Sequence, residues 1–185
     1  WSYLCCWPKS PWISEFIDHD AVNFRMWIWA SYVHHLKGIL VWQTTHWNPV
    51  EATPEGYLQN PWEEAMSWVS GYGWIKGKQT IWGNGDGRMF YPENRDVNND
   101  KRVYNQEVIP SLRLEILRDG IEDYEYLILL QKLAESKHQS GKASKAKRLL
   151  QIPESIYTNE TTYNKDPQVL LKYRKKLAEA ILSLK

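Results

Sequence analysis

One local pattern occurs twice in the chain, and it limits the possible folds more than any other feature. Residues Lys37–Trp42 and Asp86–Tyr91 each combine a glycine turn, a short apolar run and an aromatic residue at the end. A strand-like run at residues 1–6 and a helical pattern from Asp20 to about Leu36 precede the first copy. A strand, a helix and a strand in this order predict a right-handed βαβ unit with parallel strands.

The rest of the sequence continues to alternate strands with helices. A short helix is predicted at residues 62–70 behind Asn60-Pro61, and a third strand at residues 88–91. A long helix is predicted from Pro110 to about Glu135, and a final helix from Asp166-Pro167. The predicted apolar face of the long helix consists of positions three or four residues apart: Leu114, Leu117, Ile121, Tyr124 and Ile128.

This order of elements predicts an α/β fold, namely the C-terminal part of a TIM (β/α)8 barrel, about three βα units, with trailing C-terminal helices. A complete barrel has eight strands in about 250 residues, whereas three strands are visible in these 185 residues. We therefore expect that the N-terminal part of the same chain is missing. Residues 1–135 are predicted to hold the last βα units, and residues 136–185 a Lys-rich connector and a C-terminal helix that packs on the barrel.

Charge and hydropathy exclude several classes of partner. The chain has 23 Lys and Arg against 22 Asp and Glu, a net charge of +1, so no field is available to hold nucleic acid. No apolar run approaches the roughly 18 residues of a membrane span. His34 and His35 have no third ligand at a suitable spacing, so neither a metal nor another cofactor is predicted.

Tryptophan is the most unusual component of the sequence. The chain has 11 Trp residues, all at or before Trp82. Indole rings often pack in cores and interfaces, and they also stack on the apolar C–H faces of sugar rings. Composition alone leaves these two interpretations open.

The barrel hypothesis selects candidate binding residues, because the active sites of such barrels lie at the C-terminal ends of the strands. Trp42 and Tyr91 occupy equivalent strand ends and are predicted to form two walls of one pocket. His46 is also a candidate, with packing or surface exposure as the alternative, and Arg113 is one with salt bridging as the alternative. The complete candidate set is Cys6, Trp7, Trp42, His46, Trp47, Tyr91 and Arg113.

The acidic residues are predicted to have structural roles. Asp119, Glu122 and Asp123 share one face of the long helix, where Arg118 lies at the favourable spacing from Glu122. Asp86 precedes its strand, so barrel geometry makes it a turn residue at the face that serves stability. No catalytic residue is therefore predicted within this chain.

Several motifs resemble the catalytic domain of glycoside hydrolase family 123. Ser111–Glu115 and Leu117–Leu127 are similar to its signature helix, and Asn84-Gly85-Asp86-Gly87 followed by Tyr91-Pro92 to its last strand. Cys5-Cys6, Phe16-Ile17-Asp18 and Gly38–Trp42 also match, in the same order along the chain. The resemblance covers roughly residues 1–130, and it implies that the three strands are the sixth, seventh and eighth of the barrel.

The resemblance implies hydrolysis of terminal β-linked N-acetylgalactosamine by a substrate-assisted, retaining mechanism. In that family an adjacent Asp-Glu pair follows an earlier strand, which would lie upstream of Trp1, so we expect the isolated 185 residues to be inactive. An extracytoplasmic location, periplasmic or secreted, is also favoured by the resemblance. The alternatives are a non-catalytic carbohydrate-binding domain and a barrel with a purely structural role.

Overall fold

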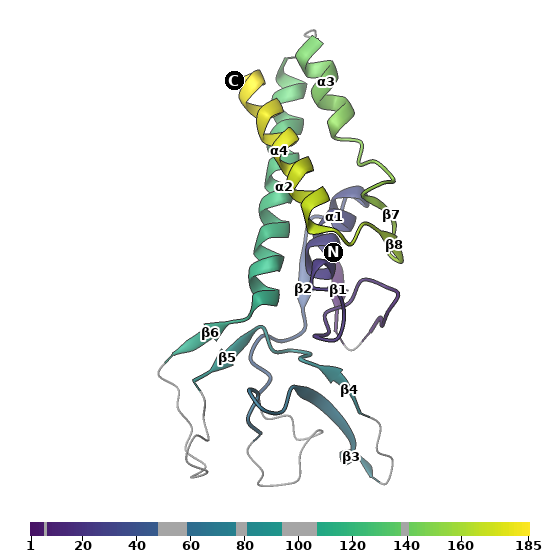
Figure 1. Ribbon diagram of the computed structural model, residues 1–185, viewed down its shortest axis with the longest axis vertical. Helices are drawn as coiled ribbons and strands as arrows, with labels where there is room; N and C mark the ends of the chain where they lie inside the picture. Colours follow the sequence, from purple (N-terminus) through teal and green to yellow (C-terminus); the bar gives the residue numbers. More distant parts are fainter. Residues whose placement is uncertain (6, 48–58, 77–80, 94–106, 138–140) are drawn as a thin grey trace. The chain divides into compact units, whose positions relative to one another are not determined.

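The computed structural model describes the chain except for residues 6, 48–58, 77–80, 94–106 and 138–140 (Figure 1). The helices and strands, in chain order, are β1 (Ser2–Leu4), α1 (Val22–Val33), β2 (Ile39–Val41), β3 (Met66–Lys76), β4 (Ile81–Asn84), β5 (Phe90–Pro92), β6 (Val108–Pro110), α2 (Leu112–Ser136), α3 (Gly141–Leu149), β7 (Tyr157–Asn159), β8 (Thr162–Tyr163) and α4 (Pro167–Leu184).

The chain forms two compact units. Unit 1 comprises Trp1–Lys9, Ser14–His19 and Ile39–Glu115, and unit 2 comprises Ser10–Ile13, Asp20–Gly38 and Ile116–Lys185. All described strands before α2 belong to unit 1, whereas the four helices, apart from the first turn of α2, belong to unit 2. The predicted division at residue 135 concerns the complete barrel and stays a prediction.

The first two predicted strands are present and pair as expected. Strands β1 and β2 are parallel, with Ser2 opposite Ile39 and Leu4 opposite Val41. The side chain of Leu4 is buried, as expected for the core side of such a pair. The parallel pairing is therefore confirmed, while the barrel around it stays a prediction.

The helix predicted at residues 62–70 is wrong. Asn60 does accept a hydrogen bond from the Trp62 backbone N–H, and Glu64 donates to the Asn60 carbonyl, but this helical turn is not continued. From Met66 the chain enters β3, which pairs antiparallel with β4. The segment Met66–Ile75 is rich in aromatic and β-branched residues and holds two glycines, a composition that favours a strand over a helix.

The third predicted strand is present, but its partner was missed. Strand β5 pairs antiparallel with β6, a strand that was not predicted. Pro110 ends β6 and does not begin the long helix. The helix α2 begins at Leu112 instead, with the Ser111 hydroxyl accepting a hydrogen bond from the Leu114 N–H at 3.2 Å, as in an N-cap.

The core of unit 2 is built on α2, with a buried face that differs from the predicted one. Ile121, predicted to be buried, is 45% exposed. The side that is buried carries residues three or four apart that include a glycine and an aspartate: Leu117, Gly120, Asp123, Leu127, Leu130 and Ala134. Gly120 and Asp123 interrupt the apolar pattern, so the sequence assigned the face to the neighbouring apolar positions.

The C-terminal part of unit 2 is partly as predicted. Helix α4 begins at Pro167, and the Asp166 carboxylate caps it by accepting from the Gln168 N–H at 2.9 Å. Leu170, Leu177 and Leu184 form its buried face. Helix α3 and the β7–β8 hairpin were not predicted. Among the described residues, no helix is long and apolar enough to cross a membrane.

Candidate functional site

A tight glycine turn organises unit 1. Gly83, Gly85 and Gly87 have φ angles of 81°, 76° and 69°, a region that favours glycine. A Cβ atom on Gly85 would lie 2.6 Å from the Ile17 side chain, and one on Gly87 would lie 2.8 Å from the His46 Cβ. These glycines therefore allow two other segments to approach the turn closely. Asp86 lies in this turn, as predicted, and is fully buried.

The segment after β2 lies along this turn and carries the first aromatic pair. The His46 N–H donates to the Gly87 carbonyl at 2.9 Å, and the Met89 N–H donates to the Thr44 carbonyl at 2.9 Å. The Trp42 and His46 rings contact edge to face with centroids 4.8 Å apart. Two predicted site residues, Trp42 and His46, are thus in direct contact.

A second aromatic pair surrounds β5. The Tyr91 and Trp62 rings are tilted with centroids 4.9 Å apart. The Trp62 indole donates to the Pro92 carbonyl at 2.6 Å, and the Trp47 indole donates to the Phe90 carbonyl at 2.9 Å. Trp62 is 45% exposed and was missed, because the sequence placed it on a helix.

The Arg113 guanidinium connects three segments of unit 1. It donates to the Glu15 carbonyl at 2.7 Å and to the Arg88 carbonyl at 2.5 Å. Burial lowers the pKa of Arg113 from its ordinary value, and Tyr91, Glu15 and Asp86 oppose this shift. Arg113 is therefore buried as a cation that faces a phenol and two carboxyl groups.

Two buried carboxyl groups lie beside Arg113. Glu15 is 1% exposed and Asp86 is 0% exposed. Burial raises the pKa of Glu15 to about 9. The neighbouring Asp86 adds to this shift, and Arg113 opposes it. Glu15 thus keeps its proton at neutral pH. Glu15 was not among the predicted site residues, although an acid between the apolar residues Ile13 and Phe16 was a signal for burial.

The remaining predicted site residues are less informative. Trp7 is 64% exposed, and the Lys9 ammonium lies 5.2 Å from the centroid of its ring. Cys6 lies outside the described residues. No group of three or more His, Cys, Asp and Glu side chains suited to a metal ion occurs in the part of the chain that is described.

The acids of α2 form an ion network in unit 2. Asp123 is fully buried and receives hydrogen bonds from Arg25 at 2.6 and 3.0 Å and from the Trp29 indole at 2.8 Å. The exposed Glu122 binds Arg174 of α4, and this bond lowers the pKa of Glu122, with Arg118 as a weaker influence. The ion pairs of Asp119, Glu122 and Asp123 are made with Arg25 and Arg174, whereas the prediction paired Glu122 with Arg118.

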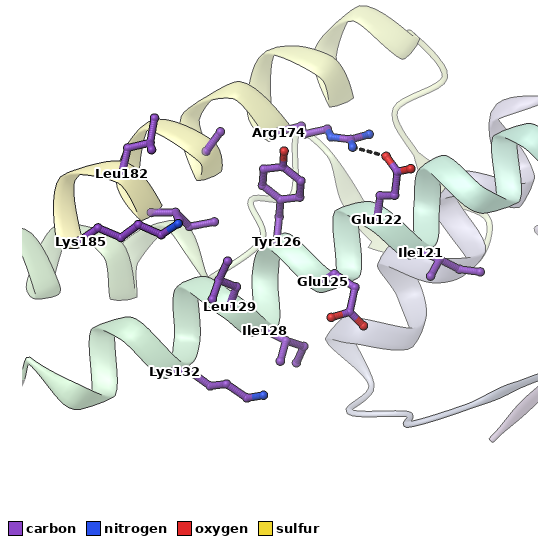
Figure 2. A pocket seen from close by; sticks show the side chains of 12 residues that line it. Ile121, Glu122, Glu125, Tyr126, Ile128, Leu129, Lys132, Arg174, Leu182 and Lys185 are labelled. Carbon is purple, nitrogen blue, oxygen red and sulfur yellow. Dashed lines mark hydrogen bonds and ion pairs between the residues drawn. The ribbon is translucent and has the colours of Figure 1, made fainter.

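A groove of about 710 Å³ lies between α2 and α4 (Figure 2). Its lining is mainly apolar, with Ile128, Leu129 and Leu182 among the lining residues, and the Glu122–Arg174 ion pair lies at its edge. None of the candidate sugar contacts lines it. Charged side chains also line it, namely Glu122, Glu125, Lys132, Arg174 and Lys185. Because the predicted sugar contacts lie elsewhere, the aromatic and charged cluster of unit 1 is the better candidate for the functional site.

Comparison with known proteins identifies one related family. The family model described as "Glycoside hydrolase 123, catalytic domain" matches residues 1–130. The match includes all residues of unit 1 and most of α2. No curated protein matches the chain.

Proposed function

Because this chain belongs to the glycoside hydrolase 123 catalytic-domain family, we propose that it takes part in hydrolysing terminal β-linked N-acetylhexosamine, of the N-acetylgalactosamine type. The chain is a glycoside hydrolase domain. The substrate and the mechanism are the proposed part. The observation that carries the proposal is the family match over residues 1–130, which covers the aromatic and charged cluster of unit 1.

The proposed mechanism uses the substrate's own acetamide. The acetamide oxygen attacks the anomeric carbon, one carboxylate orients the acetamide and a second carboxyl group protonates the leaving oxygen. This chemistry differs from the common scheme in which an enzyme carboxylate is the nucleophile. We assign the two acids to an Asp-Glu pair outside these 185 residues, on the preceding part of a (β/α)8 barrel.

The residues of unit 1 then serve sugar binding. Trp42 offers an indole face for stacking, supported by His46 at 4.8 Å. Tyr91 offers a phenol supported by Trp62 and Arg113. Glu15 and Asp86 are acidic, but their exposed fractions of 1% and 0% argue against direct proton transfer to a substrate oxygen, which needs hydrogen-bond reach.

A comparison of substrates tests the proposal. The full-length protein should hydrolyse an aryl β-N-acetylgalactosaminide, and replacing the acetamido group by a hydroxyl should remove turnover. A thiazoline that mimics the cyclised acetamide should inhibit competitively. Equal turnover of the β-galactoside would contradict substrate assistance. Binding of the sugar without any turnover would favour the carbohydrate-binding alternative.

A further inference from the structure

Helix α2 exposes apolar side chains along the groove that it forms with α4. Ile121 is 45% exposed and Leu129 is 42% exposed, while Ile128 is half-buried. All three line the groove, and Leu182 of α4, which is 69% exposed, adds a further apolar side chain to it. Single exposed apolar residues are ordinary on a protein surface, but several that line one groove mark a place where another surface binds.

Two charged side chains lie on the same face of α2 as these apolar residues. Positions 121, 125, 128 and 132 fall within about 60° of one another around an α-helix, and Figure 2 shows Glu125, Ile128 and Lys132 projecting from one side of α2. Glu125 and Lys132 are exposed, and neither has an ion-pair partner among the described residues. They lie two turns apart, about 10 Å along the helix, which is too far for an ion pair within one copy.

The order of these residues is complementary to itself when the helix direction is reversed. The peptide bond between Ile128 and Leu129 is the midpoint between Glu125 and Lys132. When two copies of α2 lie antiparallel about a two-fold axis at this midpoint, Glu125 of each copy faces Lys132 of the other. Ile128 and Leu129 of both copies then meet at the axis. Such self-complementarity is the requirement for an isologous, two-fold symmetric interface.

We propose that the groove between α2 and α4 is the contact surface of a two-fold symmetric dimer of this chain, in which Glu125–Lys132 ion pairs flank an apolar centre. An apolar core with a polar rim is the usual anatomy of a protein interface. Leu182 extends the apolar centre onto α4. Glu122 takes no part, because Arg174 of the same copy already binds it. The dimer is independent of the proposed substrate.

Analytical ultracentrifugation of the full-length protein tests the dimer and its charge pattern. The wild type should sediment as a dimer. Glu125→Lys and Lys132→Glu should each raise the dissociation constant about tenfold or more, because like charges then face each other on both sides of the axis. The double variant, Glu125→Lys with Lys132→Glu, exchanges the two charges and should restore the dissociation constant of the wild type.

Lys175→Glu is the matched control for these charge reversals. Lys175 is exposed on α4 and does not line the groove, so its reversal should leave the dissociation constant unchanged. A monomeric full-length protein would overturn the proposal, including one in which another segment of the same chain covers the groove. A dimer that neither single variant weakens would also overturn it, as would a loss of dimer that the double variant does not reverse.

Discussion

At the scale of single residues, burial gives the acids of this chain different properties from those their sequence positions suggest. Glu15 lies in a loop but is buried against Asp86 and Arg113. Asp123 lies in the helix motif that resembles the family signature, yet it is fully buried and paired with Arg25. These two buried acids therefore have different roles because their surroundings differ.

The first residue-scale prediction concerns pH and the stability of the full-length protein. Burial and Asp86 raise the pKa of Glu15 from 4.5 to about 9, so between these values the folded state holds a proton that the unfolded state has lost. The proton on Glu15 stabilises the folded state fully at pH values below the pKa that Glu15 has in the unfolded chain. This stabilisation is lost as the pH rises to the pKa of the folded state, by at most about 1.4 kcal/mol per pH unit.

Glu15→Gln tests this pH dependence, because glutamine cannot lose a proton. Its free energy of unfolding, from denaturant titrations at several pH values, should rise relative to the wild type between pH 5 and pH 9. A difference between variant and wild type that stays constant over this range would show that Glu15 does not hold the proton.

The second residue-scale prediction concerns the ion network of unit 2. Asp123→Ala removes the partner of Arg25, which is 5% exposed, and should lower the free energy of unfolding by about 3–5 kcal/mol. Glu122→Gln is the matched control, because Glu122 is exposed and its pair with Arg174 is accessible to solvent, so its thermal stability should change little.

The same control addresses catalysis. Glu122→Gln should change hydrolysis by less than about tenfold, whereas loss of a general acid lowers the rate by about 10²–10⁴. A loss of that size at unchanged Tm would place the catalytic centre on α2 and contradict the structural assignment.

At the scale of helices and strands, the sequence predicted those elements whose local signals agree. The β1–α1–β2 segment has a helical pattern between two short apolar runs, and helix α4 has a clear start signal at Asp166-Pro167. The segment 62–70 has a helix-start signal followed by strand-forming residues, and the start signal produced only one turn. The buried face of α2 was missed because Gly120 and Asp123, which contact α1, do not look like core residues.

Gly120 leads to a prediction about the contact between α1 and α2. A Cβ atom at this position would lie 2.9 Å from Ile28 Cγ1 and 3.2 Å from the Arg25 Cα. Gly120→Ala would gain about 1 kcal/mol in helix propensity and lose about 1–3 kcal/mol from overpacking, since the Arg25 backbone has little freedom to move. We therefore expect a lower Tm by calorimetry.

Gly141→Ala is the matched control for this substitution. A Cβ atom on Gly141, in α3, would meet nothing within 4 Å, so this variant should keep or raise the Tm. If Gly120→Ala raised the Tm as much as Gly141→Ala, the close contact between the two helices would be contradicted.

At the scale of the whole molecule, the sequence allowed the family to be inferred but not the assembly of the candidate site. The aromatic strand ends Trp42 and Tyr91 were visible as a repeated pattern. Their supports were not, because Trp62, Glu15 and the turn around Asp86 come from segments far apart in the chain. Contacts of this kind depend on tertiary packing, which local sequence patterns do not encode.

The most direct test of the central claim, that unit 1 supplies the sugar contacts of a glycoside hydrolase, is kcat/KM for the full-length protein on an aryl β-N-acetylgalactosaminide. Trp42→Ala and Tyr91→Phe should each lower kcat/KM by about tenfold or more, from a lost contact of about 1–3 kcal/mol. Trp12→Ala, which removes an exposed tryptophan of unit 2, should leave kcat/KM unchanged. Unchanged kcat/KM in both unit 1 variants, in an otherwise active enzyme, would contradict the account.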